Sequence, residues 1–405
     1  MLARATDDRV ARIAWSRLCE PGDQAAAVLV DTYGAKDALS WAVEHMPVTT
    51  AETGPGSPAE GPSPVQSPAG VPQGLRRPLA RWAQRLPVLD LDALLSVLER
   101  VRGSVVVPGD RQWPAGLDDL GAAAPLCLWT RGNSDLRLLL EEGVAVVGSR
   151  ACTEYGSWVA GSLSADLADA GRAVVSGGAY GIDAAAHRGA LGGGGPTVAF
   201  LAGGVDRLYP AGNARLLQTV IEQGGSVVSE LPPGSIPSKH RFLQRNRLIA
   251  AGTRGTVVVE AARRSGALAT AHRASALLRP LAAVPGPVTS AVSSGCHELI
   301  REGEAVCVTS AAEVLELLGA VTGDRCEPST VADPRAAARR DVTGGPGGID
   351  GRVCDALPVR GSADAESVAR VAGLAIAETL PSLGRLELQG IVRRTGSGGW
   401  QLAEP

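Results

Sequence analysis

Residues 239–251 carry the most chemically informative side chains of the chain, in the order Lys-His-Arg-Phe-Leu-Gln-Arg-Asn-Arg and then Leu-Ile-Ala-Ala. A lysine, three arginines and one aromatic ring fall within the first nine of these residues. Between positions 225 and 280 there are nine Lys or Arg and two acids, whereas the whole chain has a net charge of −3. Such a local excess of positive charge suits a polyanionic ligand. A solvated helix face is the alternative, for which Phe242 and Asn246 are unusual choices.

Three glycine-bearing loops, each following a predicted strand, offer groups that bind anions. Residues 148–150 are Gly-Ser-Arg, and Arg150 supplies a forked donor that matches a phosphate. Residues 176–178 are Ser-Gly-Gly before a predicted helix, so their backbone N–H groups can form an anion-binding nest. Arg207 is the expected anion contact of the third loop. Because ligands bind beyond the carboxyl ends of parallel strands, we expect these loops to meet at one edge of a sheet.

The same loops exclude several common sites. No Gly-Lys-Ser/Thr follows a glycine loop, as a Walker A motif requires, and the loop after the first strand lacks the dinucleotide fingerprint. Asp183 and His187 lie four residues apart, which is compatible with a general base and its orienting partner, or with an acid at a helix N-terminus and a packed histidine. His and Cys show no metal-ligand spacing, and no Gly-x-Ser-x-Gly is present. We therefore predict no metal, no cofactor and no catalytic residue.

The elements that position these loops follow from hydrophobic patterning. From residue 144 onward, runs of three to five mostly apolar residues alternate with helical patterns. This alternation predicts a parallel α/β sheet covered by helices on both faces, with right-handed crossovers. The expected strands are 144–147, 173–176, 197–201, 226–229, 256–259 and 281–284.

Composition divides the rest of the chain. Residues 7–45 and 79–102 show helical periodicity, whereas 47–74 and 320–349 are rich in Pro, Gly and polar residues. Residues 350–403 predict three short helices and a two-stranded wing, with strands at 392–394 and 400–402. The predicted domains are a helical cap (1–46), a linker (47–78), the α/β domain (79–319), a second linker (320–349) and a C-terminal module (350–405).

Cysteine usage and hydropathy indicate the compartment. The chain has 405 residues and seven cysteines, with no C-x-x-C pair, which argues for reduced thiols rather than a disulfide framework or a zinc ribbon. Its first residues include no apolar run of the signal-peptide type, and no stretch approaches eighteen apolar residues. We expect a cytoplasmic protein with no membrane contact.

Taken together, the motifs resemble the DprA/Smf family of bacterial DNA-processing proteins. The matching segments occur in the family's order and cover roughly residues 100–318 of this chain. They are VVGSR at 146–150, SGGAYGIDAAAH at 176–187, DRLYP at 206–210, SE at 229–230, RNRLIA at 245–250, VEA at 259–261, SG at 265–266 and VPG at 284–286.

The resemblance implies an extended Rossmann-like domain that binds single-stranded DNA and forms a homodimer. It also implies a protein without turnover that protects incoming strands and hands them to the RecA recombinase during natural transformation. By position, Arg150 and the 176–178 loop resemble a phosphate pocket, and Arg245 and Arg247 resemble backbone contacts. The expected DNA-binding residues are Ser149, Arg150, Ser176, Gly177, Gly178, Arg207, Lys239, Arg241, Phe242, Arg245, Asn246 and Arg247.

Three features depart from the family pattern or from a DNA-binding role. Leu243 stands where relatives place proline after the phenylalanine, and Ala211 stands where they often have lysine. The C-terminal module resembles a winged helix, but its presumed recognition helix near 374–389 carries two acids and one arginine. Phosphate repulsion disfavours DNA binding by such a helix, so we expect a protein contact or a dimer role.

Two rival functions remain open. Related folds with glycine-rich loops hydrolyse the glycosidic bonds of nucleotides, and Asp183, Glu230 and Glu260 would then be the candidate acids. The cationic run at 239–247 argues against a small substrate. A structural adaptor whose winged helix binds protein is the other alternative.

Overall fold

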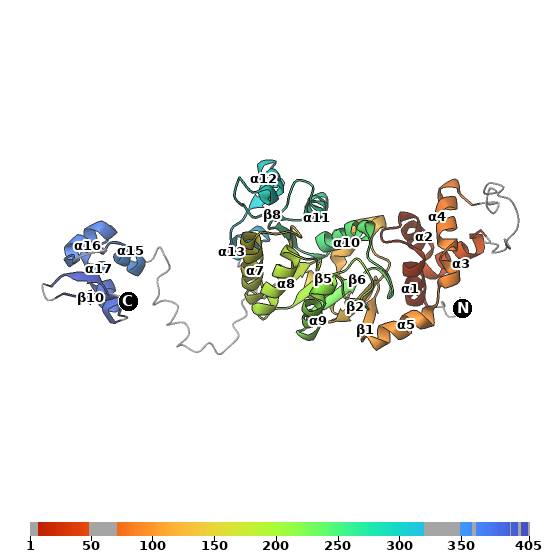
Figure 1. Ribbon diagram of the computed structural model, residues 1–405, viewed down its shortest axis with the longest axis horizontal. Helices are drawn as coiled ribbons and strands as arrows, with labels where there is room; N and C mark the ends of the chain where they lie inside the picture. The colour runs from red at the N-terminus through yellow and green to blue at the C-terminus, as the bar shows by residue number, and fades with distance from the viewer. Residues whose placement is uncertain are drawn as a thin grey trace. The chain divides into compact units, whose positions relative to one another are not determined.

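The computed structural model describes residues 7–47, 71–319, 349–358, 362–388, 390–395 and 398–403 (Figure 1). The chain divides into two compact units, residues 1–321 and 322–405. Most of both predicted linkers lies outside the described residues, at positions 48–70 and 320–348.

A nine-stranded sheet forms the centre of the first unit, in the order β1-β2-β6-β5-β4-β3-β7-β8-β9. Strands β6, β5, β4, β3, β7, β8 and β9, in their order across the sheet, run parallel to one another. Strand β2 pairs antiparallel with both β6 and β1. The predicted parallel α/β sheet is thus confirmed. The strands are β1 (Gly103–Val106), β2 (Leu128–Gly132), β3 (Val144–Val147), β4 (Val174–Ser176), β5 (Thr197–Phe200), β6 (Ser226–Ser229), β7 (Gly255–Val258), β8 (Leu281–Ala283) and β9 (Val306–Cys307).

The sequence patterns did not predict three of these strands. β1 and β2 precede the alternating strand and helix pattern and are joined by a long 3₁₀ segment, so no helical crossover marks them. β2 is nevertheless buried through Leu128 and Trp129, because β6 pairs with it and completes the sheet. β9 has only two residues, both exposed, and is held by pairing with β8.

Helices cover both faces of the sheet, as the apolar strands require. On one face α7 and α8 pack together against Val144, Val146 and Val257, and on the other α10 and α11 cover Val147 and Val258. The helices of this unit are α1 (Asp8–Leu18), α2 (Gln24–Tyr33), α3 (Ala35–His45), α4 (Gln73–Ala83), α5 (Leu91–Arg100), α6 (Leu136–Leu140), α7 (Glu154–Asp169), α8 (Ile182–Gly192), α9 (Ala214–Glu222), α10 (Lys239–Gly252), α11 (Gly266–Ala276), α12 (Ser294–Arg301) and α13 (Ala311–Leu317). Short 3₁₀ segments occupy Leu86–Val88, Ala115–Ala123, Ala211–Asn213 and Ala291–Ser293.

Helices α1 to α4 form a helical cap with its own core. Trp15 of α1 and Trp82 of α4 meet edge to face with ring centroids 5.0 Å apart, and both are fully buried. Helix α4 begins at Gln73, inside the segment predicted as linker up to residue 78. The linker prediction was therefore too long, because Leu79 and Trp82 bury α4 against α1 to α3. The predicted boundary at 79 cuts through this helix.

Arg9 links the cap to the edge of the sheet. Arg9 of α1 donates from Nη1 to the carbonyl of Val105 in β1 at 2.8 Å, and its Nη2 lies 2.5 Å from Asp110. Figure 1 accordingly shows α1 to α4 beyond the β1 edge of the sheet, while α10 lies over the sheet.

The second unit contains the three helices and two strands that the sequence predicted. They are α15 (Ile349–Asp355), α16 (Ala365–Ala372), α17 (Ile376–Leu388), β10 (Val392–Arg394) and β11 (Trp400–Leu402). Val353, Val368, Leu383 and Trp400 share its small core. The resemblance of this unit to a winged helix stays a prediction. Across the described ranges of both units, no helix combines the length and apolar character needed to cross a membrane.

Candidate nucleic-acid interface

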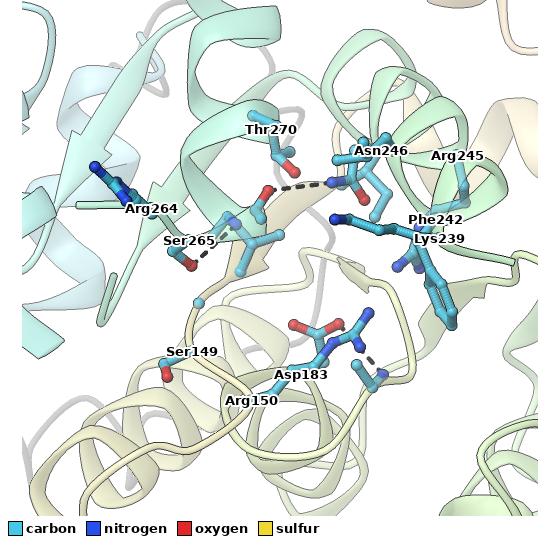
Figure 2. Close-up of a pocket in the computed structure, with 18 of the residues that line it drawn as sticks. Ser149, Arg150, Asp183, Lys239, Phe242, Arg245, Asn246, Arg264, Ser265 and Thr270 are labelled. Atoms are coloured by element: carbon cyan, nitrogen blue, oxygen red, sulfur yellow. Dashed lines mark hydrogen bonds between the residues drawn. The ribbon is translucent and has the colours of Figure 1, made fainter. Parts of the chain in front are cut away.

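The strand order of the sheet indicates where a ligand would bind. The chain passes from β3 to β4, β5 and β6 on one side and then returns to place β7 on the other side of β3. Loops that follow β3 and β7 diverge at this point, which is where open α/β sheets hold their ligands. A cleft of about 700 Å³ lies there, lined by residues 147–151, by the first turns of α10 and by residues 264–270 (Figure 2).

The loop after β3 is held rigidly and presents Arg150. The backbone N–H of Ser149 donates to the carbonyl of Glu260 at 2.7 Å, and Ile182 donates back to the carbonyl of Ser149 at 3.1 Å. Gly148 has no room for a side chain, because a Cβ would lie 2.6 Å from Ile182 Cγ1. The exposed guanidinium of Arg150 lies 4.6 Å from the centroid of the Phe242 ring. This cation–π contact preorganises the arginine while leaving its donors available.

Helix α10 directs one face toward the cleft. Ser238 caps its N-terminus, and the Oγ of this residue accepts from the N–H of Arg241 at 3.3 Å. Lys239, Phe242 and Asn246 follow at helical spacing, so all three line the cleft. Asn246 is anchored to α11 by a 3.2 Å bond from Nδ2 to the carbonyl of Gly266. Figure 2 shows Lys239 extending from α10 into the cleft. The three residues therefore line one cleft, and their contact with DNA stays a prediction.

Arg245, the fourth predicted α10 residue in the cleft wall, is buried instead of exposed. Arg245 as a whole is only 6% exposed to solvent, and its guanidinium donates to the carbonyl of Phe200. Burial lowers the pKa of Arg245 to about 10, against the favourable charge of Asp183. Burial also disfavours the charged form of Asp183 and so raises the pKa of this carboxyl above its usual value, although the charge of Arg245 opposes the shift. The two charges offset each other at the floor of the cleft.

The predicted anion nest at residues 176–178 is already filled by the protein. Asp183 Oδ2 accepts from the backbone N–H of Gly177 at 3.2 Å and of Ala179 at 3.3 Å. Gly177 is required because a Cβ there would collide with the Arg245 guanidinium. Ser176 is buried and donates from Oγ to the carbonyl of Val146 at 2.7 Å. The expectation was that Ser176, Gly177 and Gly178 face a DNA phosphate. The structure instead has the N–H of Gly177 bonded to Asp183 and the hydroxyl of Ser176 bonded within the sheet.

His187 does not pair with Asp183, despite their helical spacing. Its Nδ1 lies 2.8 Å from Thr197 Oγ1, whose hydroxyl donates to the carbonyl of Val174 at 2.6 Å. Because that hydroxyl proton is used, Nδ1 must carry the imidazole proton. Nε2 is buried and has no partner among the described residues. Burial, together with the charges of Arg245 and Arg188, lowers the pKa of His187 to about 3.

The neutral state of His187 predicts a loss of stability in acid. An unfolded histidine has a pKa of about 6.5, so below that pH the unfolded chain binds a proton that the folded protein lacks. The stability that His187 contributes above pH 6.5 is therefore lost as the pH falls toward 3. At pH 5 we expect its share of the loss to be about 2 kcal/mol. Urea denaturation at pH 7 and pH 5 measures the change in the free energy of unfolding. The variant His187→Gln, which keeps a donor to Thr197, should lose less unfolding free energy between these pH values. Equal losses in both proteins would contradict the assignment.

The N-terminus of α11 completes the cleft, and sequence reasoning left it out of the predicted site. Ser265 caps this helix by accepting from the N–H of Ala267 at 3.2 Å, and the exposed Arg264 precedes it. Helix N-termini carry partial positive charge and bind anions. The signal was available, because two arginines stand immediately before Ser265 at the end of a strand. Thr270 of the same helix also lines the cleft.

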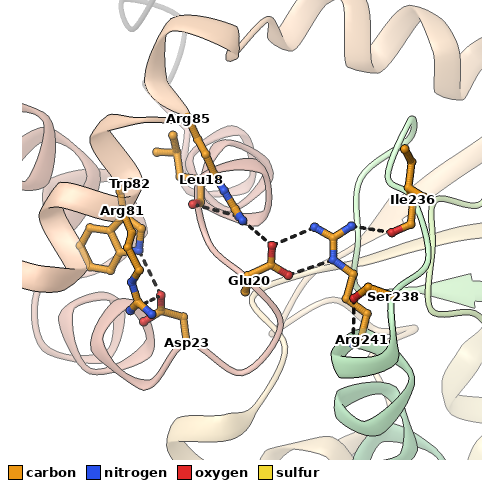
Figure 3. Close-up of polar contacts among 9 residues, drawn as sticks. All are labelled: Leu18, Glu20, Asp23, Arg81, Trp82, Arg85, Ile236, Ser238 and Arg241. Carbon is orange, nitrogen blue, oxygen red and sulfur yellow. Dashed lines mark hydrogen bonds and ion pairs between the residues drawn. The ribbon is translucent and has the colours of Figure 1, made fainter. Parts of the chain in front are cut away.

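Two predicted cations of α10 are engaged inside the protein. Arg241 forms a bidentate ion pair with Glu20 of the cap, at 2.9 Å from Nε and 2.8 Å from Nη2 (Figure 3). The Arg247 side chain is 2% exposed and forms a bidentate pair with Glu230, both bonds being 2.8 Å. Neither arginine lines the cleft, and neither does the exposed Arg207. Arg241 thus contacts the cap, and Arg247 contacts the loop after β6.

The acids that the enzyme alternative requires are also engaged. Glu260 is 1% exposed and accepts from the N–H of Thr153 at 2.9 Å and from its hydroxyl at 2.5 Å. It thereby stabilises the N-terminus of α7, where a Cβ on Gly156 would collide with its carboxylate. Glu230 is paired with Arg247, and Asp183 with the loop N–H groups. Each of the three carboxylates thus has a structural partner.

The comparisons with known proteins identify the family of the chain. Residues 104–319 match the family model described as DNA recombination-mediator protein A. The chain is 45% identical over 321 residues to the putative DNA processing protein DprA of Mycobacterium tuberculosis, covering 76% of this chain and 79% of that protein. It is also 45% identical over 192 residues to DprA of Streptococcus pneumoniae, covering 47% of this chain and 66% of that protein.

A solved structure supports the same fold. The X-ray structure of DNA processing protein A from Streptococcus pneumoniae superposes with a TM-score of 0.52 at 40% identity, covering 59% of this chain and 81% of that one. The family match spans more than half of the chain, and the mycobacterial relative aligns over most of both proteins. This chain therefore belongs to the DNA recombination-mediator protein A family, also called DprA or Smf.

Proposed function

We propose that the protein binds single-stranded DNA in the cleft between β3 and β7 and acts without turnover. One observation carries the proposal: three exposed cations from three separate elements, Arg150, Lys239 and Arg264, surround a single cleft. None of the three forms an ion pair with a carboxylate within the ranges that the structure describes. Free cations around one cleft suit a run of phosphates rather than one small anion.

The geometry favours a single strand over a duplex. Phe242 is half-buried in the cleft wall, with Arg150 over its ring and Tyr209 at 6.2 Å between centroids. A base can stack on such a ring only when it is unpaired and unstacked from its neighbours. The bases of a duplex are already stacked, so the aromatic contact would be lost. Phosphate contacts do not depend on sequence, and binding should be largely sequence-independent.

The proposal extends to the role of the family. It includes protection of the bound strand, its transfer to the RecA recombinase, and action as a homodimer in the cytoplasm. These parts rest on the family resemblance. No disulfide joins the cysteines of the described residues, which suits a reducing compartment. Against the rival glycosidase function stands the engagement of Asp183, Glu230 and Glu260 in structural bonds.

Fluorescence anisotropy of the full chain with labelled ligands tests the proposal. We expect a single strand of about 30 nucleotides to bind at least about tenfold more tightly than the same sequence as duplex, because stacking adds about 1–3 kcal/mol per base. Affinity should fall steeply with salt. Equal affinity for strand and duplex at physiological salt would overturn the proposal, and release of a free base from a nucleotide would favour the enzyme.

A chain that ends at Gly319 provides the control for this assay. Arg385 of α17 is paired with Asp350 at 2.6 Å, and Glu378 accepts from the N–H of Ala375 at 3.0 Å. The helix that would enter a DNA groove thus offers no unpaired arginine among its described residues. The shortened chain should keep its affinity within about tenfold, or about 1.4 kcal/mol. A larger loss from a folded protein would place a DNA contact in the second unit.

A further inference from the structure

Helix α4 of the cap presents a cationic face that the cleft does not account for. Its sequence, residues 73–83, contains three arginines and no acid. Pro78, Leu79 and Trp82 bury one side against the cap, which leaves Arg76, Arg77 and Arg81 exposed. Arg77 and Arg81 are four residues apart and therefore stand on one face of the helix, with Cβ atoms about 6 Å apart. Two neighbouring cations at this spacing can contact phosphates of one strand.

A groove joins this face to α10. It has a volume of about 340 Å³ and is lined by Arg81, by His240 and Gln244 of α10, and by residues 20–25. His240 is exposed and follows directly on Lys239, which lines the DNA-binding cleft. The first turn of α10 therefore borders both hollows. A chain of phosphates that leaves the cleft at Lys239 meets His240 next and then Arg81.

Glu20, one of the two acids of this groove, is already neutralised. Glu20 is held between Arg241, with bonds of 2.8 and 2.9 Å, and Arg85 (Figure 3). These two arginines lower the pKa of Glu20 against the effect of its burial, so the carboxylate is charged and fully engaged. Its charge is thus more than balanced by its two partners, and it does not repel a passing phosphate.

Asp23, the other acid, is held mainly by neutral hydrogen-bond donors. Its side chain accepts from the N–H groups of Ala25 and Ala26 at 3.1 and 3.3 Å and from Trp82 Nε1 at 3.1 Å. Arg81 adds only a long 3.4 Å contact, and its side chain is 67% exposed. Because exposed pairs of this kind contribute little, Arg81 can exchange this contact for a phosphate at small cost.

We propose that single-stranded DNA continues from the cleft over His240 into this groove and onto Arg81 and Arg77, so that the cap is a second phosphate-binding surface. The inference rests on the proposed binding of single-stranded DNA and adds a path to it. The cap then increases the number of nucleotides that contact the protein, without adding contacts to bases. Its contribution should be electrostatic and should appear only with strands long enough to reach α4.

The test compares strand lengths in the full chain carrying Arg77→Ala and Arg81→Ala. A strand of about 6 nucleotides occupies the cleft alone, whereas one of about 30 nucleotides exceeds the usual site size of a single binding surface. We expect the double variant to bind the long strand about tenfold more weakly and the short strand within about twofold of the unchanged protein. The salt slope for the long strand should fall by about 1.4, or 0.7 for each lost phosphate contact.

Two further variants control the comparison. Arg100→Ala with Arg102→Ala removes the same charge at the end of α5, which Figure 1 shows on the other side of α1 from α4. This pair should leave long-strand affinity within about twofold, since a screened distant charge contributes little. Arg77→Lys with Arg81→Lys keeps the charge and should keep most of the affinity.

The outcomes separate this inference from the proposed function. If the unchanged protein binds both strands and the Arg77/Arg81 variant retains full long-strand affinity, the path over the cap is wrong while the cleft proposal stands. Equal losses on both strand lengths would also overturn it, because α4 would then act through the fold. If the unchanged protein binds neither strand, both proposals fall.

Discussion

Replacing Arg245 by alanine is expected to lower the free energy of unfolding by about 3–5 kcal/mol, because the substitution leaves a buried charge without its partner. Arg245 lies at the floor of the cleft, where its charge balances Asp183 and its Nη1 donates to the carbonyl of Phe200. Without it the Asp183 carboxylate keeps its two backbone donors but loses the neighbouring cation. Urea denaturation at pH 7 measures the loss.

A double-mutant cycle with Asp183→Asn separates the charge effect from lost packing. If the pair is coupled, Arg245→Ala should cost less in the Asp183→Asn background by more than about 1 kcal/mol. The family resemblance implies that Arg245 contacts the DNA backbone, in which case Arg245→Ala would weaken DNA binding without unfolding the protein. The opposite is now expected, and an undiminished unfolding free energy with reduced DNA affinity would restore Arg245 as a ligand contact.

Removing Arg150 and Lys239 together should produce the largest loss of DNA affinity. Each charged hydrogen bond to a phosphate is worth about 1–3 kcal/mol, so Arg150→Ala with Lys239→Ala should weaken single-strand binding by about a hundredfold or more. Both side chains are exposed, and the unfolding free energy should stay within about 0.5 kcal/mol. The salt slope should fall by about 1.4. Anisotropy titrations at several salt concentrations provide both values.

Arg207→Ala is the matched control for this double variant. Arg207 is exposed and was expected from the sequence to contact the ligand, yet it does not line the cleft. Its removal should change affinity by less than about twofold, since only screened long-range attraction is lost. A loss as large as that of Arg150 would show that the strand passes over the loop after β5 instead of the first turn of α10.

Much of the α/β core could be predicted from local patterns. The strands β3 to β8 are short apolar runs between helices, and a strand buried on both faces must be apolar along its whole length. The order of the loops along the chain then placed Gly148, Ser149 and Arg150 at the ligand edge, where the structure has them. The antiparallel strands β1 and β2 were missed because, among the described strands, β1 pairs only with β2, and β2 joins the sheet by pairing with β6, about a hundred residues further along the chain.

The sequence determined that residues 239–247 hold a cluster of cations, but only the tertiary structure decided what each cation does. A helix repeats every 3.6 residues, so neighbouring charges point in different directions. In α10 this directs Lys239 and Phe242 into the cleft, and it directs Arg241 and Arg247 to carboxylates of the cap and of the loop after β6. Glu20 lies 221 residues from Arg241 in the chain, and no local pattern links them.

The glycine loop at 176–178 is a second case in which tertiary structure, not local sequence, decides which partner a group has. Its composition correctly indicated a nest of N–H groups, which any nearby anion can fill. Whether that anion is a phosphate or Asp183 depends on the position of the first turn of α8, which packing against β3 and α7 fixes. Residue type and spacing thus determined which groups could bind phosphate. Burial and the partners brought by distant elements decided that Arg150, Lys239 and Arg264 remain free to do so.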